Sequence, residues 1–166
     1  MSDEVELRPL TAETRPVAEQ LWQLYRHDLS EFRDSLPDEY GRFHERTLVP
    51  YFEPDEERAA YLFQRNGIPV GFAFVSRVVT GPRLMSEFFV VRALRRQGIA
   101  AAAVDELFAR HRGTWEIPFQ ENNVAAARFW RRTAERVARG EVQEERRPVP
   151  GKPEIPHDVW ITITVG

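Results

Sequence analysis

The hydrophobic pattern of the first sixty residues predicts one short strand followed by two helices. Residues 5–10 read as the strand, and Thr14-Arg15-Pro16 then opens a helix, because proline is tolerated in the first turn. The positions of this helix that recur at helical spacing are Val17, Leu21, Leu24, Asp28 and Phe32, with Tyr25 and Leu29 beside them. A second helix is expected over residues 38–49, before the loop marked by Pro50 and Pro54.

The middle of the chain has the pattern of β-structure. Residues 60–65 and 68–79 are predicted to pair as a hairpin, because Asn66-Gly67 between them is a strong turn signal. Residues 85–91 form an apolar run with little alternation, which predicts a strand buried on both faces. Glu87 is the single charge in that run.

The last third of the chain alternates between helix and strand periodicity. Gly98 precedes a helical pattern, residues 114–120 alternate like a strand, and Asn122 or Asn123 can cap a helix that ends near residue 133. Two strands are expected after it, of which residues 158–165 are placed by their β-branched content. The order β-α-α-β-β-β-α-β-α-β-β predicts an α+β fold of three layers with a mixed sheet.

Composition narrows the class of protein. The chain of 166 residues has the length of one domain and contains no cysteine, which excludes disulfides, thiolate metal sites and a cysteine nucleophile. Its beginning lacks the features of a signal peptide, and no apolar run approaches the ~20 residues that span a bilayer. We therefore expect a cytoplasmic protein with no membrane partner. The four histidines show no metal-ligand spacing, so no metal is expected.

Charge is distributed unevenly along the chain. The net charge of −3 combines −8 over residues 1–60 with +5 over residues 61–166. Overall acidity argues against a nucleic-acid partner, because such proteins usually carry a basic surface. The uneven distribution is also compatible with ordinary surface charge.

The segment Arg95-Arg96-Gln97-Gly98-Ile99-Ala100 combines features that bind phosphate groups. Gly98 allows a ligand to approach the backbone, and the first turn of the following helix leaves N–H groups unpaired. The helix dipole and the two arginines favour an anion at the same place. The segment lacks the Gly-Lys-Ser/Thr of a P-loop and the three spaced glycines of a dinucleotide fingerprint. It predicts a pyrophosphate site of another kind, although a basic loop before a capped helix has the same pattern.

These residues resemble the GNAT superfamily of acyltransferases, whose motif is Gln/Arg-x-x-Gly-x-Gly/Ala. A second segment, in which Asn123, Ala126, Phe129 and Trp130 fall at the superfamily's spacing, supports the resemblance. It implies a single GNAT-like domain over residues 1–166, with acetyl-CoA held by backbone amides of the loop. More narrowly, residues 85–132 resemble a bacterial group known only as predicted acetyltransferases.

The resemblance also implies where the cofactor lies. In GNAT enzymes the mostly antiparallel sheet splays after the strand that precedes the loop, and the pantetheine arm enters the gap. Pro118 supports this interpretation, because a proline belongs where strand pairing has ended, although a simple edge strand would accept it too. The expected cofactor-binding residues are Phe88, Phe89, Val90, Arg95, Arg96, Gln97, Gly98, Ile99, Ala100, Ala101, Asn123, Ala126, Phe129 and Trp130.

Proton transfer requires a base whose pKa lies near the working pH. Glu87 is the candidate, because some GNAT enzymes place a glutamate in this strand and burial would raise its pKa. The alternative is a glutamate that pairs with an arginine or faces solvent. Where the superfamily often has a tyrosine acid the chain has Trp130, whose indole is too weak an acid to protonate a thiolate. Water, another tyrosine or release of an unprotonated thiolate would then be needed.

The acceptor side is expected to include Tyr25 and Asp28 on the first helix. An acid on an apolar stripe needs a partner, which is either a cationic group of the substrate, a helix cap or an arginine. The first alternative predicts acceptors with a second, cationic group. The sequence predicts an acetyl-CoA-dependent N-acetyltransferase that acts on a small or peptidic amine by direct attack, since no nucleophile with an adjacent base is visible. The alternative is a GNAT domain that binds acyl-CoA without turnover. A homodimer is left open.

Overall fold

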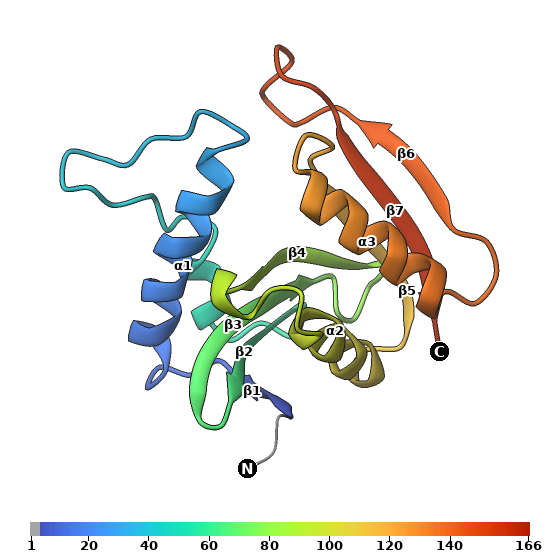
Figure 1. Ribbon diagram of the computed structural model, residues 1–166, viewed down its shortest axis with the longest axis horizontal. Coiled ribbons are helices and arrows are strands. Elements are labelled where there is room, and N and C mark those ends of the chain that lie inside the picture. Colours follow the sequence, from blue (N-terminus) through green and yellow to red (C-terminus); the bar gives the residue numbers. More distant parts are fainter. Residues whose placement is uncertain (1–3) are drawn as a thin grey trace.

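The computed structural model describes residues 4–166, which fold into one sheet with helices packed against it (Figure 1). In chain order the elements are β1 (Val5–Pro9), α1 (Arg15–Ser30), the 3-10 turn η1 (Val49–Phe52), β2 (Arg58–Arg65), β3 (Ile68–Ser76), β4 (Arg83–Val90), the 3-10 turn η2 (Arg92–Leu94), α2 (Ile99–Arg110), β5 (Gly113–Phe119), α3 (Val124–Val137), β6 (Gln143–Arg147) and β7 (Asp158–Val165).

The sheet has the strand order β1-β2-β3-β4-β5-β7-β6. All neighbours are antiparallel except β4 and β5, which are parallel because α2 crosses between them. The β2–β3 hairpin turns at Asn66 and Gly67, whose φ angles of 53° and 76° both lie in the left-handed region. The predicted mixed, mostly antiparallel sheet is therefore confirmed. Of the two strands expected at the end of the chain, β6 is the one that the sequence pattern did not place.

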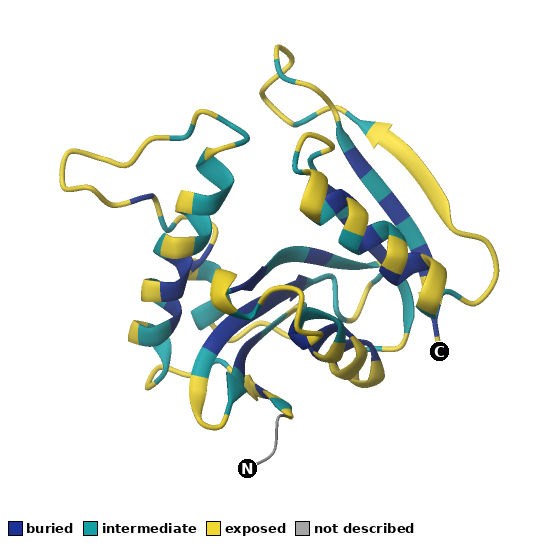
Figure 2. Ribbon diagram, viewed as in Figure 1, coloured by how far each residue is buried: buried dark blue, intermediate teal, exposed yellow. Residues whose placement is uncertain are grey.

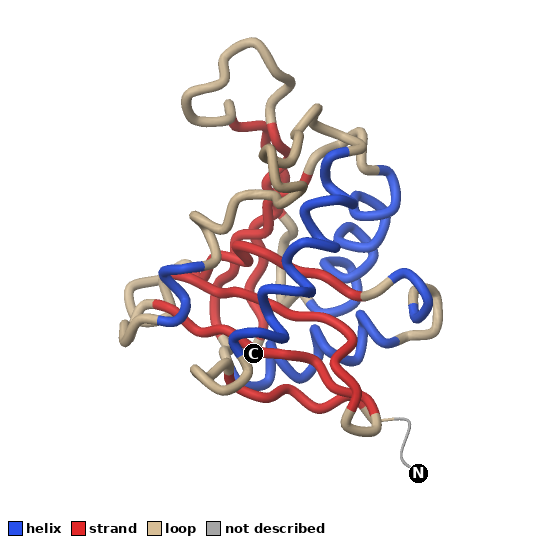
Figure 3. Tube along the Cα trace, turned by 90° about the vertical axis from the view of Figure 1, so that its left-hand side faces the viewer, coloured by secondary structure: helices blue, strands red, loops and turns tan. Residues whose placement is uncertain are grey.

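Helices cover both faces of the sheet, so the predicted three-layer α+β fold is confirmed. On one face Trp22 of α1 packs with Phe72 and Phe74 of β3. On the other face α2 and α3 pack with β5 and β7 in a second cluster that includes Leu107 and Trp115. The buried stripes lie along the sides of the helices that meet the strands (Figure 2). The turned view in Figure 3 shows the helices packed against the sheet.

Strands β4 and β5 pair at one end only. Their register consists of Arg83 opposite Trp115 and Leu84 opposite Glu116, after which the strands separate. We call the unpaired stretch, residues 85–90 of β4 and 117–119 of β5, the β4–β5 gap. Pro118 lies in this stretch, so its missing N–H removes no bond between the two strands. Since β5 pairs with β7 on its other side, it is an inner strand and not a simple edge.

The predicted helix over residues 38–49 is wrong. This segment is an extended loop that ends in η1. Its backbone finds partners on α1, because the Gln23 amide both donates to the carbonyl of Phe43 (2.9 Å) and accepts from its N–H (2.7 Å). The indole N–H of Trp22 donates to the carbonyl of His44 (2.8 Å). These bonds replace the ones that a helix would make.

Two finer expectations also need correction. The apolar stripe predicted for α1 does not coincide with the face of the helix that is buried, since Leu24 is 54% exposed whereas Trp22 is fully buried. The inward face instead carries Ala18, Leu21, Trp22 and Tyr25. Strand β4 is not buried on both faces along its whole length, because Glu87 and Phe88 are only partly buried where β5 has moved away.

Candidate active site

The start of α2 is a helix N-terminus without a side-chain cap. Gly98 caps the helix with φ of 80°, a left-handed conformation that disfavours other residues. No side chain caps this end, and the carbonyl of Gly98 already accepts the first helical bond from Ala102 (3.0 Å). The N–H groups of the first turn are therefore available to a ligand. Ile99 is buried against the core and fixes the turn to the sheet, whereas Gly98 itself is exposed.

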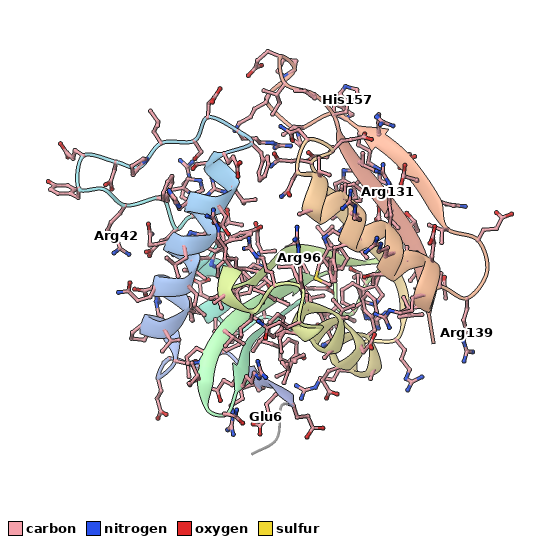
Figure 4. All side chains as sticks on the ribbon, in the orientation of Figure 1. Glu6, Arg42, Arg96, Arg131, Arg139 and His157 are labelled. Carbon is pink, nitrogen blue, oxygen red and sulfur yellow. The ribbon has the colours of Figure 1, made fainter. Side chains whose placement is uncertain are left out.

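The polar side chains before Gly98 point in different directions. The Nε of Arg95 donates to the carbonyl of Val90 (2.9 Å), which turns its guanidinium back toward β4. Gln97 donates to the carbonyl of Ala93 (3.0 Å). Arg96 is exposed, pairs with no acid among residues 4–166, and lies between α1 and α3 in Figure 4. Arg96 is thus the free cation beside the turn.

The backbone of β4 presents polar groups to the β4–β5 gap. The N–H of Val91 donates to the carbonyl of Val70 on the β3 side (2.9 Å). Because backbone groups alternate in direction along a strand, those of Phe88 and Val90 point to the other side, into the gap. The side chain of Phe89 instead packs against α1, where its ring centroid lies 5.7 Å from that of Tyr25.

Helix α3 supplies an aromatic wall on the opposite side of the sheet. Asn123 caps the helix by accepting from the N–H of Ala126 (3.2 Å). The ring centroid of Phe88 lies 5.9 Å from that of Phe129 and 5.1 Å from that of Trp130. Trp130 is only 6% exposed, so its role here is packing. Ala100 and Ala101 on α2, also expected at the cofactor, are partly buried and add little bulk.

Glu87 and Tyr25 meet on the α1 face of β4. The hydroxyl of Tyr25 donates a short hydrogen bond to the Glu87 carboxylate. Burial raises the pKa of Glu87 to about 7, although the Tyr25 hydrogen bond and the charge of Arg26 oppose the shift. Burial, followed by the charge of Glu87, raises the pKa of Tyr25 well above its usual value. The pair therefore offers a carboxyl group that exchanges protons near neutral pH.

Asp28 lies elsewhere on α1 and already has partners. Its carboxylate accepts from Arg92 (2.6 Å), the first residue of η2, and from Arg95 (2.5 Å), which follows η2. The sequence leaves three partners open for Asp28: a cationic group of the substrate, a helix cap or an arginine. In the structure its partners are arginines. The two ion pairs join α1 to the loop before α2. A role of Asp28 at the acceptor stays a prediction, without a free carboxylate to support it.

Two long-range contacts, which the sequence could not reveal, join the segment after α1 to β7 and to the start of α3. Arg33, just after α1, pairs with Asp158 at the start of β7, and Asn122 donates to the carbonyl of Phe32 (3.2 Å). The partners are far apart along the chain, so no local sequence pattern predicts these contacts. The segment after α1 consequently spans from α1 to both β7 and the start of α3.

Glu116 is a buried carboxylate that the sequence pattern does not single out. It lies on β5, at the last position paired with β4, and is 7% exposed. Arg77 (2.8 Å) and Arg147 (2.5 Å) pair with it from two other segments. Residues 4–166 contain no group of three or more acidic or histidine side chains that could hold a metal ion. No helix in this part of the chain is long and apolar enough to cross a membrane.

Comparison with known proteins identifies similar sequences and folds. The sequence model of the acetyltransferase (GNAT) family matches residues 18–134. A search among curated proteins finds no match. An acetyltransferase from Thermus thermophilus superposes with a TM-score of 0.68 at 15% identity and covers 98% of this chain and 97% of its own.

Two further solved structures share the fold. The ribosomal-protein-S18-alanine N-acetyltransferase from Escherichia coli has a TM-score of 0.62 at 16% identity, over 98% of this chain and 94% of its own. A GNAT family acetyltransferase from Elizabethkingia anophelis, solved with acetyl-CoA bound, has a TM-score of 0.62 at 12% identity, over 99% and 100%. At such identities the similarity concerns the fold alone. The narrower resemblance to one bacterial group stays a prediction.

Proposed function

The chain belongs to the acetyltransferase (GNAT) family, and from this premise we propose that it transfers the acetyl group of acetyl-CoA to a primary amine of a small molecule or peptide. The observation that carries the proposal is Glu87, a carboxyl group with a pKa of about 7 on the strand that borders the β4–β5 gap. A base for an amine works best when its pKa lies near the working pH.

The residues around the gap fit acetyl-CoA, which supplies an activated acetyl thioester. The first-turn amides of α2 would bind its pyrophosphate, with Arg96 as the nearby free cation. The gap-facing backbone groups of Phe88 and the N–H of Val90 would hold the pantetheine arm. Phe129 and Trp130 would form the apolar wall of this slot. The first-turn amides of α2 have no side-chain cap, and Arg96 is exposed, so these groups are accessible to a ligand.

In the proposed reaction, Glu87 accepts the proton that the acceptor amine loses as its nitrogen bonds to the acetyl carbon. The carbon–sulfur bond breaks and CoA leaves as a thiolate. Tyr25 positions Glu87 through its hydrogen bond. Direct attack needs no enzyme nucleophile, in agreement with the lack of cysteine in the chain.

A second candidate function is binding of acyl-CoA without turnover. Trp130 favours it, because α3 carries an indole where many family members have a tyrosine. An indole can donate a hydrogen bond but does not release its proton at neutral pH. The other residues of the proposed site serve a binding module equally well.

A panel of primary amines, assayed with acetyl-CoA for release of free CoA, separates the two functions. We expect turnover of at least one amine, with kcat/KM that rises with pH through about 7 as Glu87 loses its proton. Glu87→Gln should lower kcat by about 100-fold or more, the usual contribution of a general base, and should retain acetyl-CoA binding. Binding without turnover across the panel would support the module instead.

A further inference from the structure

Arg26 is a cation beside the proposed base, and it forms no ion pair with another side chain among residues 4–166. It lies on α1 next to Tyr25, and its charge lowers the pKa of both Tyr25 and Glu87. Positions 22, 25, 26 and 29 fall on one side of a helix, so Arg26 shares the inward side with the buried Trp22. Its guanidinium therefore acts on the same part of the molecule as Glu87.

The hydrogen-bonding capacity of Arg26 is mostly unused. Within the described part of the chain it has one hydrogen-bond partner, the hydroxyl of Ser35, at 3.2 Å from Nη2. The Nε atom is buried and has no hydrogen-bond partner among these residues. No acidic side chain of residues 4–166 forms an ion pair with it. A guanidinium normally binds a carboxylate through two parallel N–H groups when one is available.

The acids near this region are already neutralised by other arginines. Asp28 pairs with Arg92 and Arg95, and Asp158 pairs with Arg33. Glu116 lies between two further arginines. These three acids are therefore not available to Arg26. Asp28, the acid expected at the acceptor, is likewise not free to hold a second cationic group of a substrate.

We propose that Arg26 binds a carboxylate of the acceptor, so that the substrate class is an amino acid whose amine faces Glu87. This inference rests on the proposed function, since it assigns the acceptor of the same site. An amino acid would place its amine at the base and its carboxylate on the adjacent guanidinium, whose free N–H groups it would satisfy. A peptide N-terminus lacks the neighbouring carboxylate and would lose this contact.

The test compares amino acids with their α-carboxamides, which are equal in size but uncharged at that position. Across several side chains, we expect kcat/KM with acetyl-CoA to be higher for the acid by about tenfold or more, equivalent to about 1.4 kcal/mol. The amine of an amide is less basic and therefore more often neutral, so amine reactivity alone would favour the amide. Equal values, or a preference for amides or peptides, would overturn the inference while leaving N-acetylation intact.

Arg26→Gln should reduce the acid-to-amide ratio toward one, and Arg26→Lys should leave an intermediate ratio because it keeps the charge without the paired N–H groups. Arg132→Gln removes the same charge from an exposed position on α3 and should keep the wild-type ratio. If Arg26→Gln does not fold, the lysine variant decides, and a wild-type ratio in it would contradict the proposal.

Calorimetric binding of the amino acid to the protein saturated with CoA provides a readout that needs no turnover. We expect binding that weakens in Arg26→Lys and is unchanged in Arg132→Gln. Binding of this kind without acetylation of any amine would support the role of Arg26 and refute the proposed function. Acetylation of amines with no Arg26-dependent binding of amino acids would do the reverse.

Discussion

At the scale of single residues, Glu87 shows how a partly buried position sets a proton affinity. Its carboxylate accepts a hydrogen bond from Tyr25 and lies near the charge of Arg26, and both interactions favour ionisation. Loss of hydration outweighs them and moves the pKa up to about 7. The same burial that would suit Glu87 to act as a base makes its ionised form costly to the fold.

That cost predicts a pH-dependent stability. Between pH 4.5 and about 7 the folded protein holds the Glu87 proton whereas the unfolded chain has released it, so the free energy of unfolding falls as pH rises through this window. The full loss is about 3 kcal/mol at most, because a tenfold difference in proton affinity between the folded and unfolded states corresponds to about 1.4 kcal/mol. Urea unfolding from pH 5 to pH 8 should show this decline in the wild type and a smaller one in Glu87→Gln. Parallel curves would contradict the assignment, and exposed Glu31→Gln serves as the control.

At the scale of elements, the loop over residues 31–48 takes some of its backbone hydrogen bonds from α1 and makes others within itself. Gln23 alone makes two of them, both to Phe43. Gln23→Ala should lower the free energy of unfolding by about 1–3 kcal/mol, because it leaves partly buried backbone groups unpaired. Urea titration measures the change, and limited proteolysis should show earlier cleavage within the loop.

Leu24→Ala is the matched control for Gln23→Ala, since Leu24 is 54% exposed on the same helix. Its effect should stay within about 0.5 kcal/mol, as is usual for surface positions. Equal stability of the two variants would show that the loop does not rely on Gln23.

The same loop explains which elements can be predicted from the sequence. Most of the strands and the three long helices have local signals, such as the Asn66-Gly67 turn and the alternation of Trp115 and Ile117. The pattern of residues 38–49 predicts a helix wrongly because their partners lie on α1, some twenty positions earlier. The periodicity of a segment carries no information about partners that lie elsewhere in the chain.

At the scale of the whole molecule, ligand binding should stabilise the fold as a unit. At 100 times its Kd, CoA should add about 2.7 kcal/mol to the free energy of unfolding. Thermal melts with and without CoA measure this gain. Gly98→Trp should abolish it, because bulk and a strained left-handed residue would occupy the first turn of α2.

Gly140→Trp provides the matched control for the melts. Gly140 is also exposed, has φ of 86°, and has no neighbour that an added Cβ would touch. Both variants therefore carry the same kind of backbone strain, but only Gly98 lies at the proposed cofactor turn. A CoA-induced rise in Tm that survives in Gly98→Trp would place the cofactor elsewhere.

The two sides of the site differ in how far the sequence predicts them. The proposed cofactor side is encoded in the contiguous residues 95–100, so the pattern indicates both the turn and the helix that follows it. The proposed acceptor side is assembled from α1, the loop after it and β7, with a contact between Arg33 and Asp158. Arg26 carries no distinguishing mark in the sequence, because its lack of an ion pair among residues 4–166 is visible only in the fold.

The β4–β5 gap also has a consequence for how the protein behaves in storage. The unpaired stretches of β4 and β5 are edges in the interior of a sheet, and an unpaired edge is a template on which the strand of another molecule can add. A bound pantetheine arm would cover these edges. Preparations kept with CoA should accordingly accumulate fewer intermolecular aggregates than those kept without it, so that the ligand would also protect the protein in storage.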